Sequence, residues 1–216
     1  MQFKFGLEHE VAFLNAAGEF ADFTNTTFEM FDRIIQKLPY CDGDATYLRS
    51  GDSGIRKKRW YIEGFERFSP EGKLIDCLPK GIEIRTSVYG EIDGAIAALT
   101  NDYNLLVKIA SEQGFSPIAL SFNPNKTAFI PDPPLNAYEC AEGYDSPFEQ
   151  LPMLSYGPDL NFSFSPWSAD QMIDIAHLSG TADPAEGVGA RSPATRPQNH
   201  AGCRTASAIG GGGVWV

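Results

Sequence analysis

The stretch FKFGLEHEVAF, residues 3–13, alternates between apolar and polar side chains. This period is typical of a strand with one buried face. His9 falls on the apolar face, where we expect a core histidine with one hydrogen-bond partner rather than a ligand. The polar face carries two carboxylates as near neighbours, Glu8 and Glu10.

Glu8 and Glu10 on one strand face would repel each other, and the repulsion would raise the pKa of one of them. A divalent cation removes this repulsion, and Mg²⁺ accepts a few carboxylates together with water and phosphate oxygens. The pair therefore predicts a divalent-metal site. The alternative is an exposed strand face with two ordinary glutamates. The chain has only three histidines, which also favours oxygen ligands.

Two later segments show the same alternation. Residues 82–88 place Glu83 and Arg85 together, away from the apolar face. Residues 159–164 place Asn161 on the polar face, although an asparagine at a strand bend explains that residue nearly as well.

A further strand around Trp60 carries Glu63 and Glu66 on opposite faces, so either glutamate could join the acidic group. Several strands with charge on one face and bulky apolar groups on the other predict an α+β protein with a curved antiparallel sheet. We expect the carboxylates on its concave face and helices on its convex face.

The remaining elements follow from caps, turns and periodicity. Thr27 is placed to cap a helix, and Gly114 to end one. The expected elements are helices at 27–38 and 91–113, strands at 19–23, 59–68, 73–78, 82–89 and 115–123, turns at 69–72 and 79–81, a loop or lid at 124–150, and a final helix starting at Ser168 or Asp170.

Composition narrows the class of protein. The net charge of −11 argues against binding to nucleic acid or anionic membrane surfaces, and no apolar run approaches the roughly 20 residues that span a bilayer. The four cysteines form no CxxC pair, which favours free thiols and a cytoplasmic location. The basic run at 56–59 is either a solvated loop or a phosphate contact.

The character of the sequence changes abruptly near residue 178. Residues 1–178 are typical of a folded domain, whereas residues 179–216 are mostly Gly, Ala, Pro, Ser, Thr and Arg. Such a segment buries too little apolar surface to offset its ordering entropy. We interpret it as a disordered, out-of-frame tail that follows a partial catalytic domain. A natural flexible tail is the alternative.

Four motifs in order resemble the glutamate–cysteine ligase family, within the glutamine synthetase-like carboxylate–amine ligases. The first is FGLEHE at 5–10, and the second is GIEIRT at 81–86. A long helix and the segment from Gly114 to Pro124 come next, and DLNFSF at 159–164 resembles a family strand with a central asparagine. The resemblance covers residues 1–178, and this part of the chain is most similar to a bacterial, cyanobacterial-like branch of the family.

The resemblance implies a curved half-barrel sheet, incomplete in this chain, that holds Mg²⁺ and ATP. It implies Glu8, Glu10, Glu63 and Glu83 as metal ligands, and Glu8, Glu10, Glu83 and Asn161 as contacts of the cofactor. Arg85 would lie near phosphate or a substrate carboxylate, although the plant type has no arginine there. The stretch between Glu63 and Glu83 is also longer than in the family.

The implied activity joins the γ-carboxylate of glutamate to an amine, cysteine in the named family, through an acyl-phosphate. Family members run well beyond 216 residues, and their later strands complete the nucleotide site. The alternative is therefore an inactive, truncated fragment with at most residual metal or ligand binding. A glycosidase is disfavoured, because two carboxylates on one strand do not flank a sugar bond.

Overall fold

The structure is a computed structural model that describes residues 2–41, 59–165, 168 and 171. In these ranges the chain is α+β, with an open antiparallel sheet of six strands and few helices. The strands are β1 Gln2–Leu14, β2 Phe20–Ala21, β3 Trp60–Phe68, β4 Leu74–Arg85, β5 Ser116–Ile118 and β6 Gly157–Ser165. The helices are α1 Phe28–Lys37, α3 Ile92–Glu112, α4 Ala137–Ala141, α5 Pro147–Gln150 and the 3-10 turn η1 Leu151–Leu154.

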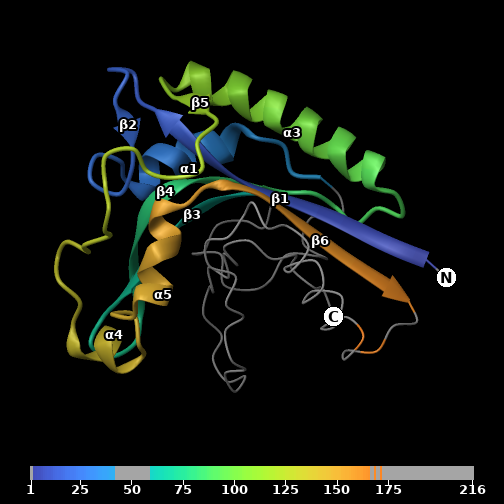
Figure 1. Cartoon of the computed structure of the whole chain (residues 1–216). Helices are drawn as coiled ribbons and strands as arrows, with labels where there is room; N and C mark the ends of the chain where they lie inside the picture. Colours follow the sequence, from blue (N-terminus) through green and yellow to red (C-terminus); the bar gives the residue numbers. More distant parts are fainter. Residues whose placement is uncertain (1, 42–58, 166–167, 169–170, 172–216) are drawn as a thin grey trace.

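β1 is the strand around which the sheet is organised (Figure 1). Residues 8–11 of β1 pair with β4, and residues 2–10 pair with β6. The end of β1, residues 12–14, pairs with the short strands β2 and β5. β3 pairs with β4 and closes the order β1-β4-β3.

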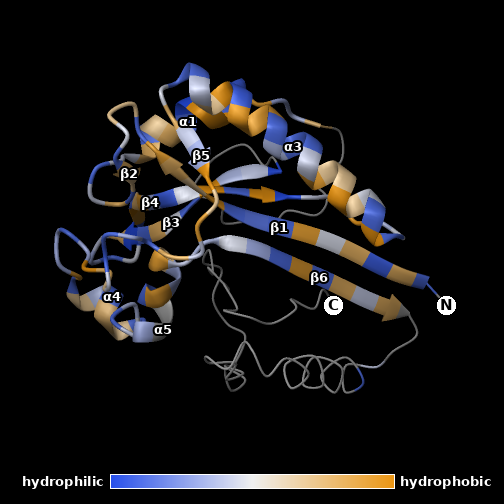
Figure 2. Cartoon of the chain, turned by 45° about the horizontal axis from the view of Figure 1, so that its top comes forward, coloured by the Kyte–Doolittle hydropathy of each residue, from blue (hydrophilic) through white to orange (hydrophobic). Residues whose placement is uncertain are grey.

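The two long helices cover one face of this sheet. α1 packs on β3 and β4, and α3 packs on β1 (Figures 1 and 2). The core beneath them is built from the apolar face of the strands and from one side of each helix: Val11, Phe13, Phe31, Ile34, Ile35, Trp60, Ile62, Ile82, Ile84, Leu106 and Ala110. The alternation of hydropathy along β1 and β6 is visible in Figure 2. Thr27 is the N-cap residue of α1, as predicted, but its side chain makes no capping hydrogen bond.

The predicted turn at 79–81 is wrong. β4 runs without interruption from Leu74 to Arg85, so the two expected strands are one. The register with β3 shifts here, because Glu63 faces Gly81 while the next residue of β3 faces Pro79. A bulge accommodates a proline inside a sheet. A side chain at Gly81 would meet the carbonyl oxygen of Val11, so glycine permits β1 to approach β4 closely.

Two expected strands are much shorter than predicted. The strand at 115–123 is paired with β1 only over Ser116–Ile118, because the residues of β1 that a longer strand would meet already pair with β4 and β6, and beyond it Phe122 forms only an isolated bridge with Ser155. The strand at 19–23 is paired only at Phe20 and Ala21. The carboxylate of Asp22 accepts hydrogen bonds from the amide and hydroxyl of Thr24, which turns the chain away.

Only part of the apolar surface of α3 faces the sheet. Leu106 and Ala110 are buried, but Ile96 is 50% exposed. Ala95 takes the buried position instead. The helix covers the sheet with its Ala95 side, which allows closer approach than isoleucine would.

The long segment at 124–150 is ordered and includes α4 and α5. A buried ion pair attaches it to the β3–β4 hairpin. Arg67 Nε lies 2.7 Å from Glu139 Oε1, and Glu139 is fully buried. Glu139 also accepts hydrogen bonds from the amides of Phe68 and Asn136, at 2.9 and 2.8 Å.

The C-terminal predictions mostly lie outside the described residues. Ser168 and Gln171 exchange side-chain to backbone hydrogen bonds of 2.9 and 3.3 Å, a pattern that begins helices. The predicted tail at 179–216 is not described. In the part of the chain that is described, no helix is long and apolar enough to cross a membrane.

Candidate functional site

The strand register brings the predicted acidic residues onto one face of the sheet. Glu8 of β1 stands opposite Arg85 of β4, and Glu10 stands opposite Glu83. Residues directly opposite in an antiparallel pair share a face. Glu83 is in turn opposite Tyr61 of β3, so three strands contribute to one row of side chains. We call its carboxylates, Glu8, Glu10 and Glu83, the acidic row. This face points away from α1 and α3, as the alternation predicted.

Glu63 and Glu66 are both buried, but the register separates them. Glu63 follows Tyr61 by two residues and therefore shares the face of Glu83. Glu66 lies beyond the register shift and stands opposite Cys77. The geometry thus groups Glu63, rather than Glu66, with the acidic row.

Arg85 is held between two carboxylates and an aromatic ring. Its Nε is 3.4 Å from Glu8 Oε1, and its Nη2 is 3.3 Å from Glu83 Oε2. The guanidinium carbon lies 3.9 Å from the centre of the Tyr61 ring, a cation–π distance. These contacts fix the plane of the guanidinium at the border between the acidic row and a neighbouring pocket.

Lys80 is a functional candidate that the sequence analysis missed. Its side chain is fully buried, and Nζ lies 2.7 Å from Glu10 Oε2. Nζ also donates to the carbonyl oxygens of Pro152 and Ser155, at 2.6 and 2.9 Å. Its position in the alternation with Leu78 and Ile82 was the available signal, because a lysine at an apolar position requires partners.

Asp159 was missed as well. It stands directly opposite Glu8 across the β1–β6 pair, where two like charges oppose each other. Burial, followed by the charges of Glu10 and Glu8, raises the pKa of Asp159 to about 6, while Lys80 acts in the opposite direction. The signal was its place two residues before Asn161 on the same strand face. A proton or a cation is therefore favoured between β1 and β6.

We expect Asp159→Asn to stabilise the protein above pH 6 and to change its stability little below pH 3.8. Because folding raises this pKa, the ionised carboxylate reduces stability as pH rises from 3.8 through about 6. Urea unfolding midpoints in chelator-containing buffer at both ends of this window measure the effect. Asp145→Asn, at an exposed acid, is the matched control. An equal shift at both pH values would contradict the assignment.

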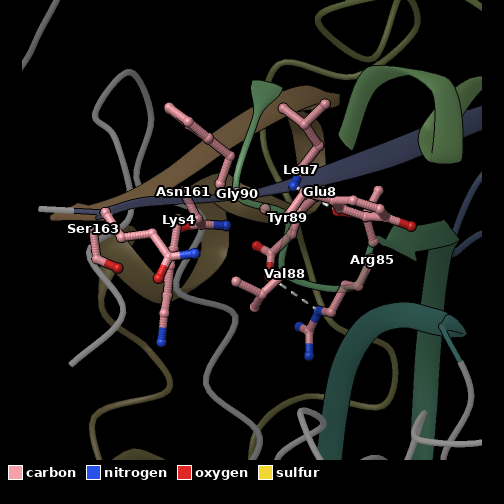
Figure 3. Close-up of a pocket in the computed structure, with 13 residues that line it drawn as sticks. Lys4, Leu7, Glu8, Arg85, Val88, Tyr89, Gly90, Asn161 and Ser163 are labelled. Atoms are coloured by element: carbon pink, nitrogen blue, oxygen red, sulfur yellow. Dashed lines mark hydrogen bonds and ion pairs between the residues drawn. The ribbon is translucent and has the colours of Figure 1, made fainter. Parts of the chain in front are cut away.

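A pocket of about 400 Å³ opens beside Arg85, between β1, β6 and the segment that follows β4 (Figure 3). Its polar lining consists of Gln2, Lys4, Glu8, Arg85, Thr86, Asn161 and Ser163. Leu7, Val88 and Tyr89 contribute apolar surface. Asn161 is 6% exposed, and its Nδ2 is buried without a hydrogen-bond partner. An unsatisfied donor of this kind favours a ligand oxygen in the pocket.

Two other features predicted from the sequence are His9 and the basic run at 56–59. His9 lies on the helix side, where its ring centre is 5.8 Å from that of Tyr103, and burial lowers its pKa while Glu10 acts to raise it. The described residues offer its ring no hydrogen bond, so the expected partner is missing. Of the basic run, residues 56–58 are outside the described ranges. Arg59 Nη1 lies 3.3 Å from Asp102 Oδ2 of α3.

The oxygen donors suit a hard divalent cation, although they are not gathered around one point. Within residues 2–41 and 59–165, no three His, Cys, Asp or Glu side chains converge closely enough to hold a metal ion. Glu8 and Asp159, which stand opposite each other, are the best-placed pair of carboxylates. Mg²⁺ accepts one or two carboxylates and takes its other ligands from water and phosphate. These two carboxylates could therefore contact such an ion, with water or phosphate completing its ligands.

The site is thus defined by four neighbouring strands, by Arg85 and Lys80, and by the pocket beside Arg85. Comparison with known proteins adds no relative to this description. No protein-family model matches the chain, and no curated protein matches it either.

Proposed function

We propose that this chain carries the site of an ATP- and Mg²⁺-dependent carboxylate–amine ligase, which joins the γ-carboxylate of glutamate to an amine such as cysteine. One observation carries the proposal: four neighbouring antiparallel strands gather carboxylates and Arg85 on the sheet face opposite the helices. The half-barrel form of the sheet belongs to the same proposal. Three of the four motifs that resemble the ligase family lie on these strands, and the third motif, from Gly114 to Pro124, contains β5.

Glu8 and Asp159 would hold Mg²⁺ together with the side-chain oxygen of Asn161. Glu10, Glu63 and Glu83 stand on the same face and extend the ligand set that the resemblance implies. When bound, the ion would offset the charge of the ATP phosphates and orient the γ-phosphoryl group.

The chain's own contribution is positioning and charge. Arg85 can offer guanidinium donors to a phosphate or to a substrate carboxylate, and its stacking on Tyr61 limits the entropy lost on binding. Lys4 places a second cation in the pocket wall. Lys80 holds one oxygen of Glu10. Acyl-phosphate chemistry needs no protein nucleophile, so such positioning is sufficient.

We expect ADP release that requires Mg²⁺, glutamate and an amine together. Glu8→Gln should weaken Mg²⁺ binding by roughly 10- to 100-fold, because it removes one charged ligand. Coupled ADP detection measures the first result, and calorimetric titration with Mg²⁺ measures the second. Glu112→Gln, at an exposed position on α3, is the control that should change neither. Unchanged Mg²⁺ binding in Glu8→Gln would refute the metal site.

A second candidate is a chain that binds ligand without turnover. The ion pairs of Glu10 with Lys80 and of Arg85 with Glu8 and Glu83 favour it, because they occupy groups that catalysis would use. Two results together select this candidate. The chain binds Mg²⁺ without releasing ADP, and a longer chain that restores the expected reading frame after residue 178 does release ADP.

A further inference from the structure

The two edges of the described sheet differ in how they are protected. β3 carries two register shifts against β4, and α4 lies against it. The amide of Phe68 at its end is capped by Glu139. Bulges and covering elements are devices that keep an edge strand from pairing with another chain. β3 is therefore a poor template for a further strand.

Among the described residues, β6 lacks these devices. It pairs with β1 over nine consecutive residue pairs without a register shift, and no other described strand pairs with it. It contains no lysine or arginine, and its one proline, Pro158, lies near its start. Leu160 is 40% exposed. A long, regular edge strand with an exposed apolar side chain is a site where another strand is expected to add.

The sequence of β6 is complementary to itself in an antiparallel arrangement centred on Phe162. Phe162 would face Phe162 of the second copy, and Leu160 would face Phe164, all on the apolar side of the sheet. On the polar side, Asn161 would face Ser163. Asp159, the one charged residue of β6, would face Ser165, so no like charges oppose each other.

We propose that the outer edge of β6 binds β6 of a second copy of this chain, antiparallel about Phe162. The two sheets would then form one continuous sheet across a two-fold axis. Asn161 and Ser163 line the pocket beside Arg85, so Ser163 of the second copy would stand next to that pocket. This inference goes beyond the proposed function and does not depend on it.

The first test is self-association of the full chain, measured by sedimentation velocity over a wide concentration range. We expect a reversible dimer with micromolar affinity, because strand addition alone buries a small interface. Leu160→Lys should weaken association at least tenfold, since it places a charge opposite Phe164 twice per dimer. Ile75→Lys, at a residue that is 64% exposed on the β3–β4 hairpin, is the control. A monomer at every concentration would overturn the proposal.

The second test fixes the register. Single cysteines are placed at 161, 162 or 163 in a background with Cys41→Ser, Cys77→Ala, Cys140→Ser and Cys203→Ser. Only position 162 would bring two Cα atoms to about 4.5–5.5 Å, within disulfide reach. We expect the disulfide-linked dimer to form most readily at 162. A maximum elsewhere would overturn the arrangement. So would a monomer in which the β6 amides that point away from β1 resist hydrogen exchange, since its own chain would then cover the edge.

Discussion

Lys80→Met is expected to lower the free energy of unfolding by about 3–5 kcal/mol, the range for removing one partner of a buried ion pair. Lys80 is fully buried, and its ammonium contacts Glu10 and the carbonyl oxygens of Pro152 and Ser155. Methionine fills the space but leaves these oxygens without their donor. Lys80 connects β4 to β1, to η1 and to the residue that follows η1. Its loss would therefore destabilise the sheet as a whole.

Denaturant unfolding followed by circular dichroism measures this effect. Lys73→Met is the matched control, because Lys73 is exposed at the tip of the same hairpin and should cost less than about 0.5 kcal/mol. The double variant Lys80→Met/Glu10→Met should recover part of the loss, since it also removes the carboxylate that has lost its contact with Lys80. If Lys80→Met and Lys73→Met proved equally stable, Lys80 would not have the structural role that its contacts indicate.

Glu139→Gln is expected to have an effect of similar size, again about 3–5 kcal/mol, for the same physical reason. The substitution keeps the shape of the side chain but leaves the Arg67 guanidinium buried without a counter-charge. Arg67 also donates to the carbonyl oxygens of Pro133 and Pro134, so the anchoring of the 124–150 segment would loosen. Glu142→Gln, three residues away and exposed, is the matched control.

The pH dependence of this difference gives a second readout. Burial acts to raise the pKa of Glu139, but the hydrogen bond from Arg67, those from the amides of Asn136 and Phe68, and the Arg67 charge outweigh it and lower the pKa below 4.5. A lowered carboxylate pKa stabilises the fold above its unfolded value, and the contribution is lost as pH falls. The gap between wild type and Glu139→Gln should therefore be full at neutral pH and shrink below pH 4.5. A pH-independent gap would contradict this account.

The parts of the site that the sequence predicts are those set by neighbours along the chain. The alternation of residues 3–13 places Glu8 and Glu10 on one face, and the same reasoning places Glu83 with Arg85. Strand alternation needs no knowledge of the partner strand. The position of Thr27 at the start of α1 is likewise a local property.

The parts that the sequence does not predict depend on pairing between distant segments. Lys80 becomes buried because the register of β3 shifts opposite it, and β3 lies outside the local window around residues 79–81. Asp159 opposes Glu8 only because β6 pairs with β1. Arg67 and Glu139 form an ion pair although they are 72 residues apart in the sequence. The sequence around one residue of such a contact does not indicate which distant residue it will meet. These three contacts therefore could not be predicted from the sequence.

The position of β1 at the centre of the sheet has a consequence for how the protein is made. Gln2 pairs with Ser165, so β1 leaves the ribosome long before β6, the strand that completes its pairing. At typical elongation rates this delay is on the order of ten seconds. During that time the apolar face of β1 has no finished sheet to join, and non-local pairing of this kind also folds slowly. A chaperone that shields nascent strands would therefore act mainly on residues 2–14.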